Sequence, residues 1–280
     1  MQRGYVTTSV GQLHYVQAGA GPDLVLIPHA GRSGRMYAAL VAELAADFRV
    51  TVVDVPGTGR SAPLPEGATM AQIGGWYAEA LAGLGLASVD LFGLHGGNKV
   101  GAAMAVRHPG LVRRFVYAGQ SHSIIPDKAT RDEIFRRTPS IQSVLGAVDP
   151  LAHWAGQFRE NAAFWWDDAL LASLADPAAR RRVVDRVIDN LEAFQDRPTF
   201  YRAAFSYDME ADLRALAMPV LVLELTTPKE DREVGRQGAA VAALIPGARL
   251  EVLDSPDTYA VTLEDRAAEV AAILRGFFRG

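Results

Sequence analysis

The sequence predicts an α/β fold with a mostly parallel central sheet and helices on both of its faces. Short apolar runs alternate with segments of helical periodicity up to about residue 118, and the alternation resumes at Pro219. This pattern is typical of parallel sheets that helices cover on both sides. From 121 to 217 the pattern is helical, without a convincing strand. We therefore predict a core formed by 1–120 and 218–280, and a helical cap over 121–217 inserted after the sixth strand.

The individual elements follow from local composition and spacing. β-Favouring residues on both sides of Gly11 predict a hairpin over 4–18. Continuous short apolar runs predict buried strands, and apolar residues at helical spacing predict helices, one of which ends at Pro109-Gly110. Before the cap, we expect strands over 24–27, 50–54 and 112–118, helices over 35–46 and 70–84, and a strand, turn and helix over 88–108. After the cap, we expect strands over 219–223 and 249–253 and helices over 232–244 and 263–278.

Composition and charge restrict the classes of partner. The chain has 280 residues, a net charge of −4 and no cysteine. A net charge of this sign and size does not indicate binding to nucleic acid or to an anionic membrane. The lack of cysteine excludes disulfides and thiol catalysis. We find no basic leader followed by an apolar run, and no window of about 18 consecutive apolar residues. We expect a cytoplasmic protein with a small-molecule substrate, no cofactor and no nucleic-acid or membrane partner, and leave a homodimer open.

One stretch, Val89–Ala105, organises the chain. An apolar strand runs into a tight turn between Gly93 and Gly97, and then into a helix of small residues. Glycines are needed there because strand and helix cross closely. This is the context of the G-x-S-x-G nucleophile elbow, which exposes its central side chain. The central residue here is His95 rather than serine.

Three further features accompany this turn: the loop around His29, the D-x-P-G-x-G-x-S sequence of Asp54–Ser61, and the helical insertion. Together they resemble the α/β-hydrolase superfamily over nearly the whole chain. The resemblance implies an α/β-hydrolase fold and a catalytic triad in the chain order serine, acid, histidine. The Asp54–Ser61 turn is usually structural in that family, so neither of its terminal residues is interpreted as catalytic.

All three triad positions that the resemblance implies are altered. Pro228 lies near the position of the acid, and Glu230 or Asp231 could replace the acid only along a re-routed loop. Thr258 or Tyr259 takes the position of the histidine, depending on a one-residue gap. The chain thus resembles a subgroup that has histidine at the elbow and a degenerate triad. We therefore expect either a catalytic mechanism that does not use the serine–acid–histidine triad or no catalysis.

The position of His95 constrains its chemistry. The helix N-terminus near Gly97 and partial burial both disfavour the charged form, so we expect a neutral imidazole at pH 7. A neutral imidazole can act as a general base or as a nucleophile. The backbone amides of Gly96 and of the loop at Ala30 would form an oxyanion hole, in which each donor contributes roughly 3 kcal/mol. The alternative is that His95 only fills the floor of a pocket.

His29 is the second catalytic candidate, because its loop follows a strand at the edge where open α/β sheets bind ligands. It would position the substrate or pair with His95; alternatively, it holds its own loop by hydrogen bonds to backbone. His122, Tyr259 and Trp165 are candidate substrate-binding residues, with ordinary packing as the alternative. An aromatic lining of this kind favours a small, largely apolar substrate. No metal site is predicted, because neither His-x-His nor H-E-x-x-H spacing is present.

Four other side chains near the strand ends have simpler interpretations. Lys99 is expected to be solvated or ion-paired, because an unpaired cation opposes the helix dipole. Ser33 and Ser121 are alternative serine nucleophiles, although neither lies in an elbow. His108 precedes Pro109 at a helix end, where a capping role is expected.

The sequence leaves three functions open. The favoured one is an enzyme without a Ser-His-Asp triad that hydrolyses a small ester or lactone, in preference to a lyase or isomerase, with His95 as base or nucleophile. The first alternative is a non-catalytic protein that keeps the pocket to bind a small molecule. The second alternative is a cofactor-free oxygenase, by analogy of fold.

Overall fold

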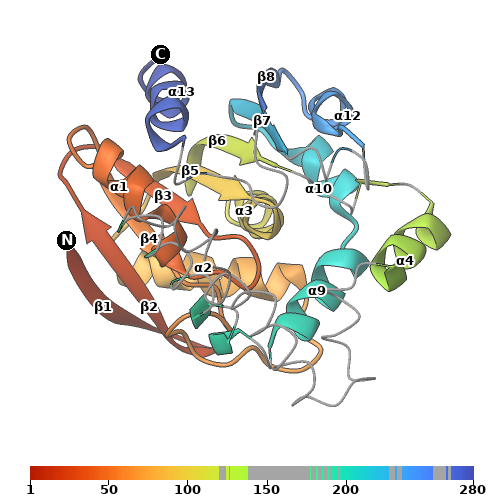
Figure 1. Cartoon of the computed structure of the whole chain (residues 1–280), viewed down its shortest axis with the longest axis horizontal. Helices are drawn as coiled ribbons and strands as arrows, with labels where there is room; N and C mark the ends of the chain where they lie inside the picture. Colours follow the sequence, from red (N-terminus) through yellow and green to blue (C-terminus); the bar gives the residue numbers. More distant parts are fainter. Residues whose placement is uncertain are drawn as a thin grey trace.

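The structure is a computed structural model. It describes residues 1–119, 124, 125, 127–137, 177, 181, 185, 188, 189, 191–193, 196–226, 231, 235–254, 263 and 266–280. Within these residues the chain forms an eight-stranded sheet (Figure 1). In spatial order the strands are β1 (Gln2–Thr8), β2 (Gly11–Ala18), β4 (Arg49–Val53), β3 (Asp23–Ile27), β5 (Val89–Leu94), β6 (Val112–Ala118), β7 (Val220–Thr226) and β8 (Arg249–Asp254).

The sheet is parallel except at one end. β1 pairs with β2 and β2 pairs with β4 in antiparallel orientation, whereas all pairs from β4 to β8 are parallel. β5 lies between β3 and β6, so the carboxyl ends of these three strands meet at one edge of the sheet. Ligands of open α/β sheets bind at this edge. The loop after β3 and the turn after β5, which carry His29 and His95, therefore lie side by side.

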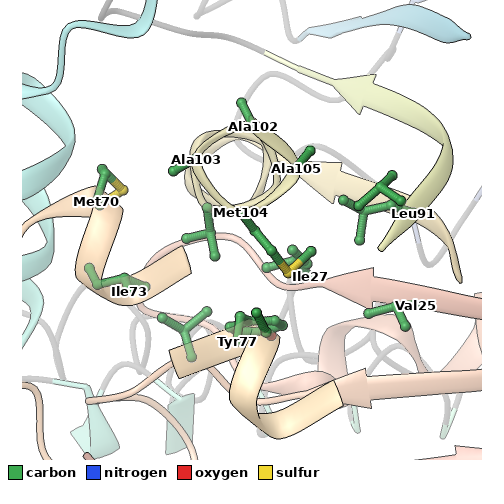
Figure 2. Close-up of a cluster of buried hydrophobic side chains, with 14 of the residues drawn as sticks. Val25, Ile27, Met70, Ile73, Tyr77, Leu91, Ala102, Ala103, Met104 and Ala105 are labelled. Atoms are coloured by element: carbon green, nitrogen blue, oxygen red, sulfur yellow. The ribbon is translucent and has the colours of Figure 1, made fainter. Parts of the chain in front are cut away.

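Both faces of the sheet are buried, which explains the continuous apolar runs of its strands. In β3, Leu24 and Leu26 pack with α1 (Ala38–Leu44) and α13 (Ala267–Arg279). The alternate residues Val25 and Ile27 pack on the other face with α2 (Met70–Gly83) and α3 (Gly96–Arg107). Figure 2 shows α3 end-on, with Met104 pointing toward Ile27 and with Ile73 and Tyr77 of α2 below the helix. The site therefore rests on a core that is packed on both sides.

The described residues between β6 and β7 contain helices and no strand. They include α4 (Lys128–Arg137), α9 (Arg197–Ser206) and α10 (Met209–Ala215). Met209 and Leu213 of α10 are buried in the cluster that contains α3, so α10 packs on the core. The boundaries of a separate cap over 121–217 remain a prediction. None of the helices in the described ranges combines the length and the apolar character that crossing a bilayer requires.

Helix boundaries differ from the predictions at three places, one of which is the helix predicted over 263–278, observed as α13 from Ala267 to Arg279. The helix predicted over 35–46 begins as a 3₁₀ turn, η1 (Gly34–Tyr37), before α1. The helix predicted over 232–244 is observed as α12 (Gly238–Leu244), and 236–237 are not helical. The amides of Gln237 and Gly238 donate to Oε1 of Glu224 at 2.8 and 2.9 Å. The carboxylate of β7 thus supplies an acceptor where α12 begins, a long-range contact that helical periodicity does not reveal.

Candidate active site

His95 occupies a strained turn between β5 and α3. Its backbone dihedrals are φ 48° and ψ −108°, and it is the one non-glycine residue of the described chain with a positive φ. Such a conformation costs on the order of 1–3 kcal/mol in a residue with a Cβ. The His95 amide donates to the Ala118 carbonyl at 3.0 Å, and Asn98 Nδ2 donates to the same oxygen at 2.9 Å. A Cβ on Gly119 would lie 3.0 Å from His95 Cε1, so this glycine leaves room for the half-buried ring.

Glycine is required on both sides of His95. A Cβ on Gly93 would lie 2.7 Å from the Gly97 carbonyl oxygen. A Cβ on Gly97 would lie 2.3 Å from the Ile27 oxygen and 2.8 Å from the Pro28 oxygen. These are backbone atoms, which cannot rotate away as a side chain can. The turn therefore brings the start of α3 directly against the end of β3.

The His29 ring lies edge-on to the His95 ring. Their centroids are 5.4 Å apart and the ring planes are inclined at 64°. Burial lowers the pKa of His29 well below its usual 6.5, and the charges of His95, Arg32, Arg197 and Lys99 lower it further. His29 is therefore neutral at pH 7. Its buried Nδ1 has no hydrogen-bond partner among the residues that the structure describes. This nitrogen does not hold the loop, whose turn is closed by the Arg32 amide donating to the His29 carbonyl at 3.0 Å.

Two backbone amides adjoin this pair of rings. A Cβ on Gly96 would lie 3.0 Å from the Ala30 nitrogen, which places the two residues in direct contact. Ala30 is 4% exposed and Gly96 is buried. The same Cβ would lie 2.8 Å from a ring carbon of Phe200. Two N–H groups next to each other in a water-poor site can stabilise a negatively charged oxygen.

Helix α9 contributes two side chains that the sequence analysis missed. The Phe200 ring packs at Gly96, and a Cβ on Gly31 would lie 2.6 Å from Arg197 Nε. Arg197 is 9% exposed, and burial lowers its pKa. These contacts join residues that are more than 100 positions apart in the chain. No local pattern in the sequence marks either residue.

Asp189 connects the segment before α9 to the loop after β3. Its carboxylate is fully buried and accepts from Ser33 Oγ at 2.5 Å, Arg32 Nε at 3.0 Å and Arg35 Nη1 at 2.7 Å. Arg35 also donates to Glu192 at 2.9 Å. Ser33, an alternative nucleophile in the sequence analysis, accepts from the Arg35 amide at 3.3 Å as the N-cap of η1. These bonds give Ser33 a structural role.

The expectation that Lys99 is solvated was wrong, and its alternative, an ion pair, is not found among the described residues. The residue is 5% exposed, and no described carboxylate pairs with it. Burial lowers its pKa from 10.5 to about 7. Lys99 follows Gly96 by three residues on α3 and so emerges on the same side of the helix. Packing from several elements buries this side, and the helix sequence alone does not indicate it.

Asp54 and Ser61 hold the turn after β4. Asp54 accepts from the Gly34 amide at 2.6 Å, and its Oδ2 lies 2.9 Å from His14 Nδ1. Ser61 Oγ donates to the Asp54 carbonyl at 2.7 Å and accepts from the His14 amide at 3.0 Å. These contacts account for both residues without a catalytic role. His108 is the C-cap of α3, and its amide donates to the Met104 carbonyl.

A family model for the "Alpha/beta hydrolase family" matches residues 24–273. The chain belongs to the α/β-hydrolase family. The family match and the eight-stranded sheet confirm the fold class predicted from the sequence. In this α/β-hydrolase the turn after β5 has the sequence Gly93-Leu94-His95-Gly96-Gly97.

Two curated relatives and one solved structure show the extent of the similarity. The pimeloyl-[acyl-carrier protein] methyl ester esterase of Aeromonas salmonicida is 30% identical over 251 residues, 88% of each chain. The (E)-2-((N-methylformamido)methylene)succinate hydrolase of Acinetobacter baylyi is 28% identical over 145 residues, so the chain spans 54% of that protein's length. The crystal structure of a hydrolase from Pseudomonas aeruginosa aligns with 100% of this chain and 99% of its own, at 26% identity and a TM-score of 0.75.

Several candidate site residues of this α/β-hydrolase lie outside the described residues. They are the substrate-binding candidates His122, Trp165 and Tyr259, the alternative nucleophile Ser121, and the triad-position residues Pro228, Glu230 and Thr258. Asp231 is described, and its Oδ2 pairs with Arg236 at 2.9 Å. Arg236 also pairs with Asp254 at 2.5 Å, at the end of β8. No described contact joins Asp231 to His29 or His95, and no three metal-ligating side chains cluster in the described part of the chain.

Proposed function

We propose that this α/β-hydrolase hydrolyses a small ester or lactone, with His95 as general base and His29 as its neutral neighbour. The observation that carries the proposal is the strained His95 turn, which holds the imidazole beside the paired residues Gly96 and Ala30. A folded chain tolerates such strain when the surrounding structure enforces it, most often at functional sites. The methyl ester esterase similar to this chain supports ester hydrolysis as the reaction class.

The proposed reaction needs only groups of this chain and water. The substrate carbonyl oxygen accepts hydrogen bonds from the Gly96 and Ala30 amides, which polarise the carbonyl carbon. His95 takes a proton from water as the water oxygen bonds to that carbon, and a tetrahedral alkoxide forms. When this intermediate collapses, the carbon–oxygen bond to the alcohol breaks and the imidazolium returns the proton to the leaving oxygen. The products are a carboxylic acid and an alcohol.

His29 has a supporting part in this scheme. Because its pKa lies well below 6.5, His29 adds no positive charge that would oppose formation of the His95 imidazolium. A neutral ring retains one acceptor nitrogen and one donor nitrogen. The edge-on contact with His95 also restricts the orientation of that ring. His29 is thus a positioning residue, and His95 is the residue that moves the proton.

A binding protein without turnover is the second candidate. The observation that favours it is the replacement of serine by His95, which removes the hydroxyl nucleophile of the G-x-S-x-G turn. The two candidates share the site and differ in whether a proton moves. Kinetics of a His95 variant therefore decides between them.

The test compares His95→Ala with His108→Ala, a matched control at the far end of α3. A panel of p-nitrophenyl esters and short lactones is followed at pH 7.5. We expect His95→Ala to lose about 10²- to 10⁴-fold in kcat/KM, as is typical of a removed general base, and His108→Ala to retain wild-type turnover. Added imidazole should restore part of the lost rate. Turnover that survives in His95→Ala would overturn the proposal, and saturable binding without turnover would establish the binding protein.

A further inference from the structure

Among the residues that the structure describes, the site contains more positive than negative side chains. Besides His95, which the proposed mechanism requires in its neutral form, the described charges that lower the pKa of His29 are those of Arg32, Arg197 and Lys99. They come from the loop after β3, from α9 and from the first turns of α3. Cations that converge on one water-poor site repel each other unless an anion is present.

The described carboxylates in this region, Asp189 and Glu192, are already engaged. Asp189 pairs with Arg32 at 3.0 Å and with Arg35 at 2.7 Å, and it accepts from Ser33 at 2.5 Å. Its charge also acts on Arg197. One carboxylate is thus shared among three guanidinium groups, of which Arg35 has Glu192 as a second partner. In the described part of the chain, Lys99 therefore has no carboxylate partner, whereas Arg197 interacts with Asp189.

Lys99 is the more informative of these two cations. The side chain is buried, and no described residue supplies a carboxylate to it. It emerges from α3 on the same side as Gly96, whose Cα faces Phe200 of α9 and Ala30. An unpaired buried ammonium is unfavourable in the empty protein, and a bound anion relieves that cost.

Both cations belong to the surroundings of the proposed oxyanion hole. Arg197 packs on Gly31, the residue after Ala30, and Lys99 lies about one turn along α3 from Gly96. The charges of both act on His29, so an anion that they bind would lie close to a carbonyl group held by the two amides. Arginine and lysine in such an arrangement bind carboxylates through charge-assisted hydrogen bonds.

We propose that the substrate carries a free carboxylate close to the group that is hydrolysed, and that Lys99 and Arg197 bind this carboxylate. The inference rests on the proposed hydrolysis at His95 and specifies its substrate as a short half-ester of a dicarboxylic acid, or a lactone bearing an acid group. This negatively charged substrate differs from the small, largely apolar substrate that the aromatic residues of 121–217 led us to expect from the sequence. The aromatic contact that the structure describes, Phe200 at Gly96, would lie next to the carbonyl end of such a substrate.

The kinetic test uses two esters that differ in one charge: mono-p-nitrophenyl glutarate and its methyl-capped, neutral counterpart. Wild type, Lys99→Met, Arg197→Met and a control, Arg249→Met, are compared at pH 7. Arg249 is suitable because its side chain is 66% exposed at the sheet edge. We expect wild type and the control to prefer the charged ester by about tenfold or more in kcat/KM, the factor that a charge-assisted contact supplies. Each site variant should reduce this preference to near one, through KM rather than kcat.

Folding of the variants is checked separately by urea unfolding. Lys99→Met removes an uncompensated buried amine, so it should unfold at a higher urea concentration than wild type. Arg197→Lys keeps the charge and should restore part of the preference that Arg197→Met loses. An equal preference for both esters in wild type would overturn the proposal.

A binding measurement separates this proposal from the hydrolysis itself. Glutarate and uncharged glutaramide are titrated into the full chain by calorimetry. We expect wild type to bind glutarate, and Lys99→Met to bind it at least about tenfold more weakly. Glutarate binding without turnover of any ester would refute the hydrolysis and support the carboxylate site. Turnover that depends on His95, together with equal affinity for glutarate and glutaramide, would refute the carboxylate site alone.

Discussion

Replacing His95 by glycine is expected to give a more stable protein than replacing it by alanine. Both changes remove the imidazole and its edge-on contact with His29, so those losses cancel in the comparison. They differ in the Cβ, which makes φ 48° and ψ −108° unfavourable. Glycine adopts such dihedrals readily, whereas alanine retains the strain. The pair of variants therefore measures the strain of the turn directly.

The magnitude follows from two opposing contributions. The strained backbone of a residue with a Cβ costs about 1–3 kcal/mol, which the glycine variant recovers. Glycine loses more conformational entropy on folding, which costs roughly 0.5–1 kcal/mol relative to alanine. The difference leaves the His95→Gly variant more stable than His95→Ala by about 1 kcal/mol. At an ordinary helical position the sign is reversed.

The assay is equilibrium urea unfolding followed by circular dichroism, with the transition midpoint compared at equal slope. Ala272→Gly serves as the control, because Ala272 is exposed in the middle of α13. This control should lose roughly 0.5–1 kcal/mol, as glycine does in helices. A His95→Gly midpoint at or below that of His95→Ala would refute the argument that the turn is strained.

Three other expectations concern the residues around this turn. Gly97→Ala places a Cβ 2.3 Å from the Ile27 oxygen, so urea unfolding should show that the free energy of unfolding falls by about 3 kcal/mol or more. In the control Gly75→Ala, the new Cβ has no atom within 4 Å and should not destabilise the protein. Because the pKa of His29 is lowered on folding, the unfolded chain binds its proton first as the pH falls below about 6.5, and stability then decreases by up to roughly 1.4 kcal/mol per pH unit. His29→Gln should flatten this decrease between pH 7.5 and 5, and an unchanged pH dependence would contradict the assignment. Asp189→Asn removes a fully buried carboxylate that the partly buried Arg32 and Arg35 share, and should cost about 3–5 kcal/mol. A loss under about 1 kcal/mol would contradict this expectation.

The strands and the turn at His95 were predictable because their signals are local. Burial on both faces of the sheet requires continuous apolar runs, and these appear at Leu24–Ile27 and Val89–Phe92. The close crossing of β5 and α3 requires glycine at two fixed positions, Gly93 and Gly97, and admits little else. Such constraints appear in the sequence as composition and spacing, so the fold class and the position of His95 could be inferred from them.

The remainder of the site depends on contacts between distant segments. Arg197 and Phe200 reach the loop after β3 and the start of α3 only because α9 folds back over them. Lys99 sits in a small-residue helix whose sequence predicts exposure, and neighbouring elements bury it. The start of α12 is likewise placed by Glu224 of β7, thirteen and fourteen residues before its donors. Neither periodicity nor propensity encodes such contacts.

Two unfavourable features occur within one turn of the same helix. His95 has a backbone that its own Cβ opposes, and Lys99 has a buried amine without a described carboxylate. A single substitution would remove either one, glycine at the first position or methionine at the second. Natural chains keep violations of this kind mainly where function requires them. In a turn that had lost its role, these substitutions would relieve the backbone strain and remove the buried amine without any loss of function. Their joint presence beside the Gly96 and Ala30 amides therefore argues for a functional site. In that site the strained turn would orient His95 as the base, and Lys99 would bind an anionic group of the substrate.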